Sequence, residues 1–560
     1  MRIVIEHDVK IPMRDGVLLS ADLYLPEGSS GPFPVLIRRT PYGKSGNPGG
    51  ASVDGLRMVR AGYALLVQDV RGRFGSGGTF EPYWNEADDG ADTVNWAAAQ
   101  PWCDGSAGLF GRSYEGMSAL LAATNGPPAL GAVAPQVAGS GFDEGWTYQG
   151  GAFQLGFVLY WVLYDLLLTG AGLDSAAERE VAEAVDAIDD LYRDPGRAAE
   201  LLDRLAPYYR EWLAHPSGHP YWSRSAPRAS YAAIKVPVLN ITGWYDIFLA
   251  GALENSTAIP GTELVVGPWS HCVTGGVFPQ RRYGLAADEQ QLDVTGLHLA
   301  HFDRHLRNRP PAQESAPVRL FLTGADQWRT FPAWPVPGTR PYVLHLAGRT
   351  LTELPGAAAA GAPGAAGAAA AAPVAPGSDV LRHDPADPVP TTGGATALPG
   401  QFTGADCGPL DQREVERRPD VLCWTTSPLD APVTVIGEAE LAVYVTPDAA
   451  GADVTGKLVD VHPDGRAEIL TDGIRRLAPG TATAPAPATR APADADGAVE
   501  VRVRLGALGH VFKEGHRIRL EIAASNTPRF DVHPKVVAHH TVHHGGDRPS
   551  RLLLSRLTDA

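Results

Sequence analysis

The sequence predicts an α/β fold followed by an all-β domain, and three observations carry this prediction. Strand-like and helix-like segments alternate over residues 1–140, which is typical of an open α/β sheet. Apolar residues then recur at helical spacing over residues 141–231, which indicates a helical insertion. Beyond about residue 340, short strands alternate with Pro- and Gly-rich turns, as in a β-sandwich or jelly roll.

The expected elements divide the chain into four parts, 1–140, 141–231, 232–339 and 340–560. The first part carries strands at 3–9, 17–24, 33–38, 64–68, 107–110 and 132–136. The insertion carries helical segments at 152–168, 174–193 and 197–213. The third part returns to the α/β pattern, with strands at 236–243, 263–267 and 317–323 and a helix at 286–307. The last part carries strands at 342–346, 433–444, 458–462, 499–505 and 516–523.

Two tracts of small residues interrupt the last part, at 355–377 and 478–496. They are rich in Ala, Gly, Pro and Thr and offer no large apolar side chains to bury. We therefore expect them to be mobile surface loops.

Length and charge limit the classes of function. The chain has 560 residues, a formal net charge of −16, and 44% hydrophobic and 20% charged residues. One hydrophobic core seldom supports this length, so two or three domains are expected. The acidic balance argues against nucleic acid or an anionic membrane as a partner. A small-molecule substrate suits the sequence better, and a homodimer is compatible with it.

The sequence predicts a cytoplasmic protein. No signal peptide is visible at the N-terminus. Residues 151–170 are strongly apolar but include Gln154 and Asp165, so a buried helix is expected rather than a membrane span. The cysteines contain no C-x-x-C pair and are expected to stay reduced, with a Cys407–Cys423 disulfide as the alternative and Cys272 as a small packing residue; the fourth is Cys103.

The segment Gly-Arg-Ser-Tyr-Glu-Gly at 111–116 is the most informative motif. It lies between an apolar stretch and a helix-like run, the context that a nucleophile elbow requires. Gly111 and Gly116 lie at −2 and +3 from Ser113, so the far side is one residue longer than in G-x-S-x-G. The turn would present the Ser113 hydroxyl at a helix N-terminus, beside the backbone N–H of Tyr114.

An acid and a base follow in the chain order Ser, Asp, His that α/β-hydrolases use. Asp246 follows the strand expected at 236–243, and His271 follows the strand expected at 263–267. His271 would accept the proton of Ser113, and Asp246 would orient the imidazole. Each residue alone has an ordinary structural explanation as a turn, cap or loop residue. The three together favour a serine hydrolase with an α/β-hydrolase core.

The histidine clusters are a weaker alternative. His298, His301 and His305 recur at helical spacing and are expected on a polar helix face, because no carboxylate or cysteine stands nearby with the usual metal-site spacing. The pairs at 539–540 and 543–544 are expected in a strand or loop. The Gly-rich segment 70–78 lacks the lysine and the residue order of a phosphate-binding loop. The sequence therefore predicts no metal and no cofactor.

Four motifs together resemble the CocE/NonD family of serine hydrolases. They are the elbow at 111–116, Arg-Thr-Pro-Tyr-Gly at 39–43, the loop at 69–77, and Gly-Pro-Trp-Ser-His at 267–271. That family contains cocaine esterase, X-prolyl dipeptidyl-peptidases, α-amino-acid ester hydrolases and glutaryl cephalosporin acylases, and it tolerates the elongated elbow. The resemblance covers nearly the whole chain. It implies an α/β-hydrolase core, a helical cap inserted into it, and a C-terminal jelly-roll sandwich.

The resemblance also implies roles for single residues. Ser113 would be the nucleophile, Asp246 the acid and His271 the base. The Tyr42 hydroxyl and the Tyr114 backbone N–H would form an oxyanion hole, for which a neutral, rigid phenol is a suitable donor. The alternative for Tyr42 is a packed loop aromatic.

The subfamily is less clear from the sequence. α-Amino-acid ester hydrolases and X-prolyl peptidases bind a substrate ammonium group with acidic residues, and Asp143 and Glu144 could serve here. A helix N-terminal acidic pair is the competing interpretation. A later family segment that usually carries a Tyr-Asp pair reads His-Pro-Tyr-Trp at 219–222, without the carboxylate.

We therefore expect an enzyme that cleaves an ester or amide through an acyl-enzyme. Alternatives are an X-prolyl dipeptidyl-peptidase or β-lactam acylase, and a carbohydrate-binding protein with an inactive core. Aromatic residues could line an apolar pocket between cap and core. These are Trp146, Phe153, Trp161, Trp244, Tyr245 and Trp269.

Overall fold

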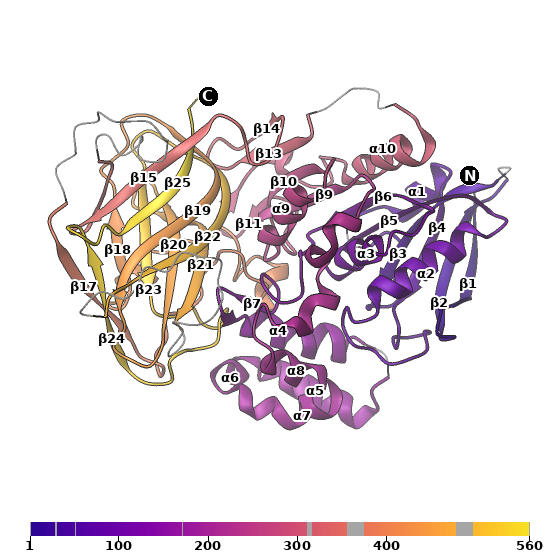
Figure 1. Cartoon of the computed structure of the whole chain (residues 1–560), viewed down its shortest axis with the longest axis horizontal. Helices are drawn as coiled ribbons and strands as arrows, with labels where there is room; N and C mark the ends of the chain where they lie inside the picture. The colour runs from indigo at the N-terminus through magenta and orange to yellow at the C-terminus, as the bar shows by residue number, and fades with distance from the viewer. Residues whose placement is uncertain are drawn as a thin grey trace.

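A mixed α/β layer, a group of helices and a β domain lie side by side in the computed structural model (Figure 1). The structure describes residues 2–28, 31–50, 52–170, 172–310, 316–354, 374–477 and 497–558. The low-complexity tract at 478–496 lies outside these residues, as does 355–373 of the first tract.

The first sheet has ten strands in the order β1-β2-β4-β3-β5-β6-β9-β10-β13-β14. The seven strands from β4 to β13 are parallel, and antiparallel strands complete both edges. The parallel strands are almost wholly buried because helices cover the sheet. The strand bounds are Ile3–Pro12 (β1), Leu18–Pro26 (β2), Phe33–Thr40 (β3), Ala64–Asp69 (β4), Cys103–Arg112 (β5), Leu130–Gln136 (β6), Leu239–Tyr245 (β9), Glu263–Ser270 (β10), Val318–Leu322 (β13) and Gln327–Phe331 (β14).

Five helices pack on this sheet: α1 (Gly55–Arg60), α2 (Glu86–Ala98), α3 (Tyr114–Thr124), α9 (Leu249–Ala258) and α10 (Val294–Arg307). The helix expected at 286–307 is shorter than predicted. It begins at Val294, where the Asp293 side chain accepts a hydrogen bond from the Gly296 N–H at 3.0 Å. This N-cap ends the preceding irregular segment and starts the helix.

The helical insertion lies below the sheet in the view of Figure 1. A short hairpin of β7 (Tyr148–Gln149) and β8 (Ala152–Phe153) leads into α4 (Leu155–Tyr160), which continues as a π-helical turn over Trp161–Leu168. Helices α5 to α8 follow at Ser175–Asp186, Ile188–Arg193, Ala199–Leu205 and Tyr208–Ala214. The buried aromatic residues of this insertion form one core with the first sheet.

The C-terminal domain is an all-β sandwich built on an eleven-stranded sheet. Its apolar residues form a separate core around Trp424, which is fully buried. The strands are β15 (Thr339–Ala347), β16 (Thr350–Thr352), β17 (Gly377–His383), β18 (Leu422–Thr425), β19 (Val433–Thr446), β20 (Ala452–Val461), β21 (Ala467–Leu477), β22 (Val499–Phe512), β23 (Arg517–Ala523), β24 (Ala538–His544) and β25 (Arg551–Leu557). The histidine pairs at 539–540 and 543–544 lie in β24.

A third apolar cluster joins the two domains. It combines Trp244 and Phe321 of the first sheet with Ile436, Ala507 and Leu557 of the β domain. The indole N–H of Trp244 donates to the Phe321 carbonyl at 2.6 Å. The C-terminal domain therefore shares buried packing with the α/β domain and is not only tethered to it.

The prediction that the histidines of α10 form a polar helix face is wrong for His298 and His301. His298 and His301 are 1% and 4% exposed, because this side of the helix packs on the sheet. The His298 ring lies against Phe110 and its Nδ1 hydrogen-bonds with the Val294 carbonyl at 2.9 Å.

The four cysteines are free thiols in the structure, so the Cys407–Cys423 alternative is excluded there. Among the described residues, no helix is long and apolar enough to cross a membrane. The apolar segment at 151–170 instead forms β8, α4 and the π-helical turn, mostly buried.

Candidate active site

The candidate nucleophile lies at a strained turn between β5 and α3. Ser113 has φ 59° and ψ −121°, a conformation that non-glycine residues rarely adopt. Its N–H donates to the Gln136 carbonyl of the neighbouring strand β6 at 2.8 Å, which holds the turn. The strain is typical of a functional position, since the surrounding structure must stabilise it.

The glycines explain the unusual spacing of this elbow. A Cβ at Gly111 would lie 2.4 Å from the Glu115 Cβ, and a Cβ at Gly116 would lie 2.8 Å from the Gly111 carbonyl oxygen. Both contacts are shorter than atoms tolerate, so neither position accepts a side chain. Glu115, at +2, is accommodated because it packs over Gly111 and forms a buried ion pair with Arg38.

Three side chains meet at the carboxyl ends of the strands. His271 Nε2 lies 3.0 Å from Ser113 Oγ, and His271 Nδ1 lies 2.8 Å from Asp246 Oδ2. Asp246 Oδ1 also accepts from the Phe248 N–H at 2.7 Å, so both carboxylate oxygens are occupied. The Asp246 side chain is buried, whereas the His271 side chain is 12% exposed and can be reached from outside.

The two hydrogen-bond donors expected at the oxyanion hole belong to neighbouring residues, since the centroids of the Tyr42 and Tyr114 rings lie 6.3 Å apart. Tyr114 begins α3, so its backbone N–H has no carbonyl partner within the helix. The Tyr42 hydroxyl accepts a hydrogen bond from the Trp161 indole N–H at 3.1 Å, which leaves its own proton free to donate. Burial and the nearby Asp165 carboxylate raise the pKa of Tyr42, so the phenol stays protonated.

Aromatic rings enclose one side of this site. Trp146 stacks on Phe248 at 3.9 Å between ring centroids, and Phe248 meets the His271 ring edge-on at 5.2 Å. Trp161 packs against Trp146 at 5.7 Å and bonds to Tyr42. Phe248 was missed in the sequence, although its position two residues after Asp246 is a usable signal. These rings give the site an apolar wall.

The other predicted pocket aromatics lie elsewhere. Trp244 and Tyr245 belong to the cluster that joins the two domains, where the Tyr245 hydroxyl lies 2.9 Å from that of Tyr283. Trp269 fills the sheet core, and its indole N–H donates to the Ala287 carbonyl at 2.6 Å. Phe153 packs against Tyr209 in the cap. Trp244, Tyr245 and Trp269 still belong to β9 and β10, whereas Asp246 and His271 lie in the loops that follow these strands, so proximity in sequence did not place the three aromatic side chains in the site.

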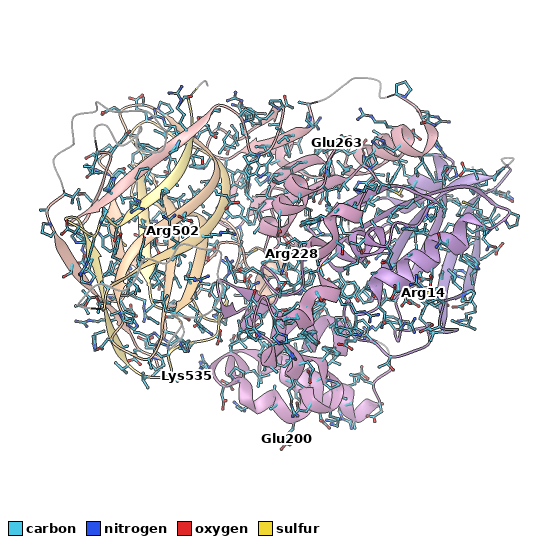
Figure 2. The ribbon with its side chains drawn as sticks, in the orientation of Figure 1. Arg14, Glu200, Arg228, Glu263, Arg502 and Lys535 are labelled. Carbon is cyan, nitrogen blue, oxygen red and sulfur yellow. The ribbon has the colours of Figure 1, made fainter. Side chains whose placement is uncertain are left out.

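Asp143 and Glu144 are engaged within the insertion. Asp143 pairs with Arg228, labelled in Figure 2, and accepts from the Gly218 N–H at 3.0 Å. Glu144 accepts from the Gly150 N–H at 2.8 Å and from the Ser217 hydroxyl at 3.0 Å. No helix begins at this pair, since α4 starts only at Leu155, so the helix-terminus interpretation is wrong. Both carboxylates connect segments of the cap.

Arg112 is a further residue that the sequence did not single out. It directly precedes Ser113, and its guanidinium donates to the His271 carbonyl and to the Ser52 hydroxyl at 3.1 Å. It thereby connects the end of β5 to the loop that carries His271. Such a contact joins residues far apart in sequence, so no local pattern predicts it.

Burial shifts the pKa of two further groups, Cys272, next to His271 in sequence, and Asp165, whose charge raises the pKa of Tyr42. Burial raises the pKa of the Cys272 thiol to about 12, so it is not a thiolate nucleophile at neutral pH. Burial likewise raises the pKa of Asp165 to about 7. The Asp165 carboxyl has no hydrogen-bond or ion-pair partner among the described residues.

The fold and this site together define a serine hydrolase of the α/β-hydrolase class. The comparisons with known proteins agree with that class. Residues 15–273 match the X-Pro dipeptidyl-peptidase family S15, and residues 311–553 match the C-terminal non-catalytic domain of X-Pro dipeptidyl-peptidases. The chain belongs to this family, which includes the CocE/NonD hydrolases it resembles.

Relatives and solved structures extend over the whole chain. Cocaine esterase from Rhodococcus sp. (strain MB1 Bresler) is 35% identical, over 98% of this chain and 97% of that protein. An aminopeptidase structure from a marine sediment Thaumarchaeota archaeon has a TM-score of 0.79 at 23% identity, covering 99% of this chain and 97% of the other. A structure of α-amino acid ester hydrolase has a TM-score of 0.77 at 24% identity, covering 99% and 96%. The two structures support the fold.

Proposed function

We propose that this protein is an acyl esterase that uses Ser113, His271 and Asp246 as a catalytic triad. The observation that carries the proposal is the continuous series of hydrogen bonds from Ser113 Oγ through His271 to Asp246. The strained serine at a helix N-terminus supports it, because this is the geometry of a nucleophile elbow. The 35% identity to cocaine esterase favours an ester over an amide substrate.

In the proposed reaction, Ser113 Oγ attacks the substrate carbonyl carbon while His271 Nε2 takes the serine proton. The negative charge that forms on the carbonyl oxygen accepts hydrogen bonds from the Tyr42 hydroxyl and the Tyr114 N–H. His271 then gives its proton to the leaving alkoxide, and the alcohol departs. Water, deprotonated by His271, hydrolyses the acyl-enzyme and releases the carboxylic acid. Asp246 orients the imidazole throughout.

The substrate class follows from the walls of the site. Trp146, Trp161 and Phe248 favour an apolar or aromatic acyl group. Recognition of a substrate ammonium by Asp143 or Glu144 is disfavoured, because both carboxylates already have partners. We therefore place aryl and alkyl esters ahead of amino-acid esters and X-prolyl peptides. A cytoplasmic location remains part of this proposal, supported by the cysteine pattern in the sequence.

A fluorophosphonate probe tests the nucleophile directly. We expect a single phosphonylated peptide that contains Ser113, found by peptide mass spectrometry, and no label in Ser113→Ala. For Ser113→Ala we also expect a fall in kcat of about 10⁵–10⁶. Label on another serine, or none on the folded protein, would contradict the triad. Sugar binding by such an unlabelled protein would instead favour the carbohydrate-binding alternative.

A substrate panel separates esterase from peptidase. We expect aryl esters to be cleaved with a kcat/KM well above that for amino-acid esters or X-prolyl anilides. Asp143→Asn and Glu144→Gln should leave the KM of neutral esters within about twofold. A large rise in KM confined to amine-bearing substrates would show that these carboxylates bind an ammonium group, and the peptidase or acylase alternative would then hold.

A further inference from the structure

Two histidines near the end of α10 lie close to a glutamate that is distant from them in sequence. His301 and His305 are four residues apart, so they lie on the same side of the helix. Glu263, at the start of β10, faces them although it precedes the first of them by 38 residues. One ligand atom from each of the three residues lies within 4.8 Å of the others. Figure 2 labels Glu263 beside this helix.

His301 is buried beside Glu263, with which a protonated ring would form an ion pair. Its side chain is 1% exposed, and neither ring nitrogen has a hydrogen-bond partner among the described residues. Burying a polar group without a partner costs free energy that folding must offset elsewhere. Its Nδ1 lies 3.8 Å from Glu263 Oε1, too far for a hydrogen bond but close to the separation of two ligands on one ion.

We propose that Glu263, His301 and His305 bind a divalent transition-metal ion, with zinc as the best match. Two imidazoles and one carboxylate are ligands that zinc takes, and solvent can supply the fourth. Tetrahedral zinc, with bonds of about 2.0–2.2 Å, separates its ligands by about 3.4 Å. His305 and Glu263 are only partly buried, so their side chains can close the remaining distance.

The neighbouring Arg304 leaves Glu263 able to bind a metal ion. Arg304 Nη1 lies 3.2 Å from Glu263 Oε1, and a carboxylate can accept that bond and still bind a metal with a free lone pair. Ligating carboxylates are commonly oriented by such hydrogen bonds. His305 also lies in the last turn of α10, whose free carbonyls favour positive charge.

The site is structural and separate from the proposed chemistry. Glu263 begins β10, whereas His271 follows the other end of the same strand. A strand of this length spans about 25 Å, so an ion at Glu263 does not reach Ser113. Its effect would be to tie α10 to the sheet.

A second histidine cluster in the β domain provides the matched control. Asp460, His462 and His516 also lie within 4.8 Å of one another. There, however, Asp460 already hydrogen-bonds with His516 at 2.9 Å and with His510 at 3.2 Å. The Asp460 carboxylate is therefore already occupied by protein partners, and we assign no metal to this cluster.

Titration of the metal-stripped, full-length protein with Zn²⁺ tests the proposal. We expect one binding event by calorimetry and a rise in Tm of about 2 °C at a zinc concentration about 100 times the Kd. Both should be lost in His305→Gln and in Glu263→Gln, and kept in His462→Gln. Co²⁺ should give the visible absorption of a tetrahedral site in the wild type and not in His305→Gln.

Three outcomes would overturn the assignment. The first is that the wild type does not bind Zn²⁺ at 100 µM. The second is that binding is unchanged in both His305→Gln and Glu263→Gln. The third is that binding is lost only in His462→Gln. Circular dichroism of each variant confirms that it is folded. Because His305 is partly exposed and Glu263→Gln is nearly isosteric, at least one variant should remain folded. Labelling of Ser113 should be the same with EDTA and with Zn²⁺, as expected for a site remote from the nucleophile.

Discussion

At the scale of single residues, the environment of Tyr42 decides what its hydroxyl can do. The Trp161 indole N–H occupies one lone pair of the phenol oxygen, and the raised pKa keeps the phenol proton in place. The hydroxyl is therefore held as a donor, in a site whose aromatic walls limit water. A fixed donor of this kind stabilises an oxyanion without reorganising during the reaction.

Replacing Tyr42 by phenylalanine tests this role. We expect kcat for an aryl ester to fall by roughly 10²–10³ with little change in KM, because the bond forms mainly in the transition state. Steady-state kinetics on matched protein concentrations measure it. Tyr164→Phe, on the nearby π-helical turn, is the control and should stay within about twofold. Activity of Tyr42→Phe within tenfold of the wild type would remove the hydroxyl from the mechanism.

Asp165 should make stability depend on pH. Its pKa is raised to about 7 by burial, whereas an unfolded aspartate has a pKa of about 3.9. Between these values the folded state holds a proton that the unfolded state releases, so this residue lowers stability as pH rises from 4 to 7. The free-energy cost of ionising Asp165 in the folded state is constant above pH 7 and absent below pH 4.

Asp165→Asn should therefore raise the Tm at pH 8 by a few degrees, and the gain should shrink towards zero at pH 4. Thermal unfolding at a series of pH values measures it. The exposed Glu183→Gln change is the control, with a Tm difference that should not vary in this way. A gain that is equal at both pH values would argue against an Asp165 that ionises in a partly buried position.

At the scale of elements, β5 and α3 approach each other so closely at the elbow that two positions of the turn accept only glycine. Gly111 lies under Glu115, and Gly116 lies over the Gly111 carbonyl, so the helix begins almost in contact with the strand. The buried Arg38–Glu115 pair then anchors the first turn of α3 to β3. The turn depends on both glycines, and so does the position of Ser113.

Gly111→Ala should disrupt this element. The added Cβ would meet Glu115 backbone and Cβ atoms at 2.4–2.9 Å, so the elbow must shift. We expect a loss of about 1–3 kcal/mol in stability and at least a tenfold slower fluorophosphonate labelling of Ser113. Gly46→Ala, where the added Cβ meets only one atom at 3.8 Å, is the control. Wild-type labelling by Gly111→Ala would mean that the turn is looser than described.

At the scale of the whole molecule, the cluster around Trp244 couples the two domains. Trp244 is 3% exposed, and a Cβ on Gly509 of β22 would lie 2.7 Å from its ring. Across the same boundary, the Thr323 hydroxyl hydrogen-bonds with His510 Nδ1 at 2.8 Å, and the Thr323 backbone hydrogen-bonds with Gly509 and Val511. The domains should therefore unfold together.

Calorimetry should show one main thermal transition for the wild type. Trp244→Ala should remove about 3–5 kcal/mol of shared packing and lower the Tm, with the two domains beginning to melt separately. Tryptophan fluorescence and circular dichroism followed together would reveal the separation. Two independent transitions in the wild type itself would show that the interface contributes little.

Much of this architecture could be read from the sequence, because it depends on local pattern. Alternation and helical spacing indicated the α/β region, the insertion and the β domain. Ser113, Asp246 and His271 could each be chosen because each directly follows a strand, and parallel strands bring their carboxyl ends to one edge. The true start of α10 was missed because caps carry weak signals, and so were strands β14, β16, β17, β18, β21 and β25. Of these, β14, β17 and β21 are edge strands, whereas β25 lies between β15 and β19.

The tertiary structure alone decided which side chains meet. Trp244, Tyr245 and Trp269 pack into other cores although they are close to site residues in sequence, because they belong to the buried strands β9 and β10 whereas Asp246 and His271 lie in the loops beyond them. The tertiary structure brought Trp146 and Phe248 together across the cap and core, and it placed Glu263 against His301. Sequence determines the period of each element, whereas contacts between elements depend on packing that no local window contains.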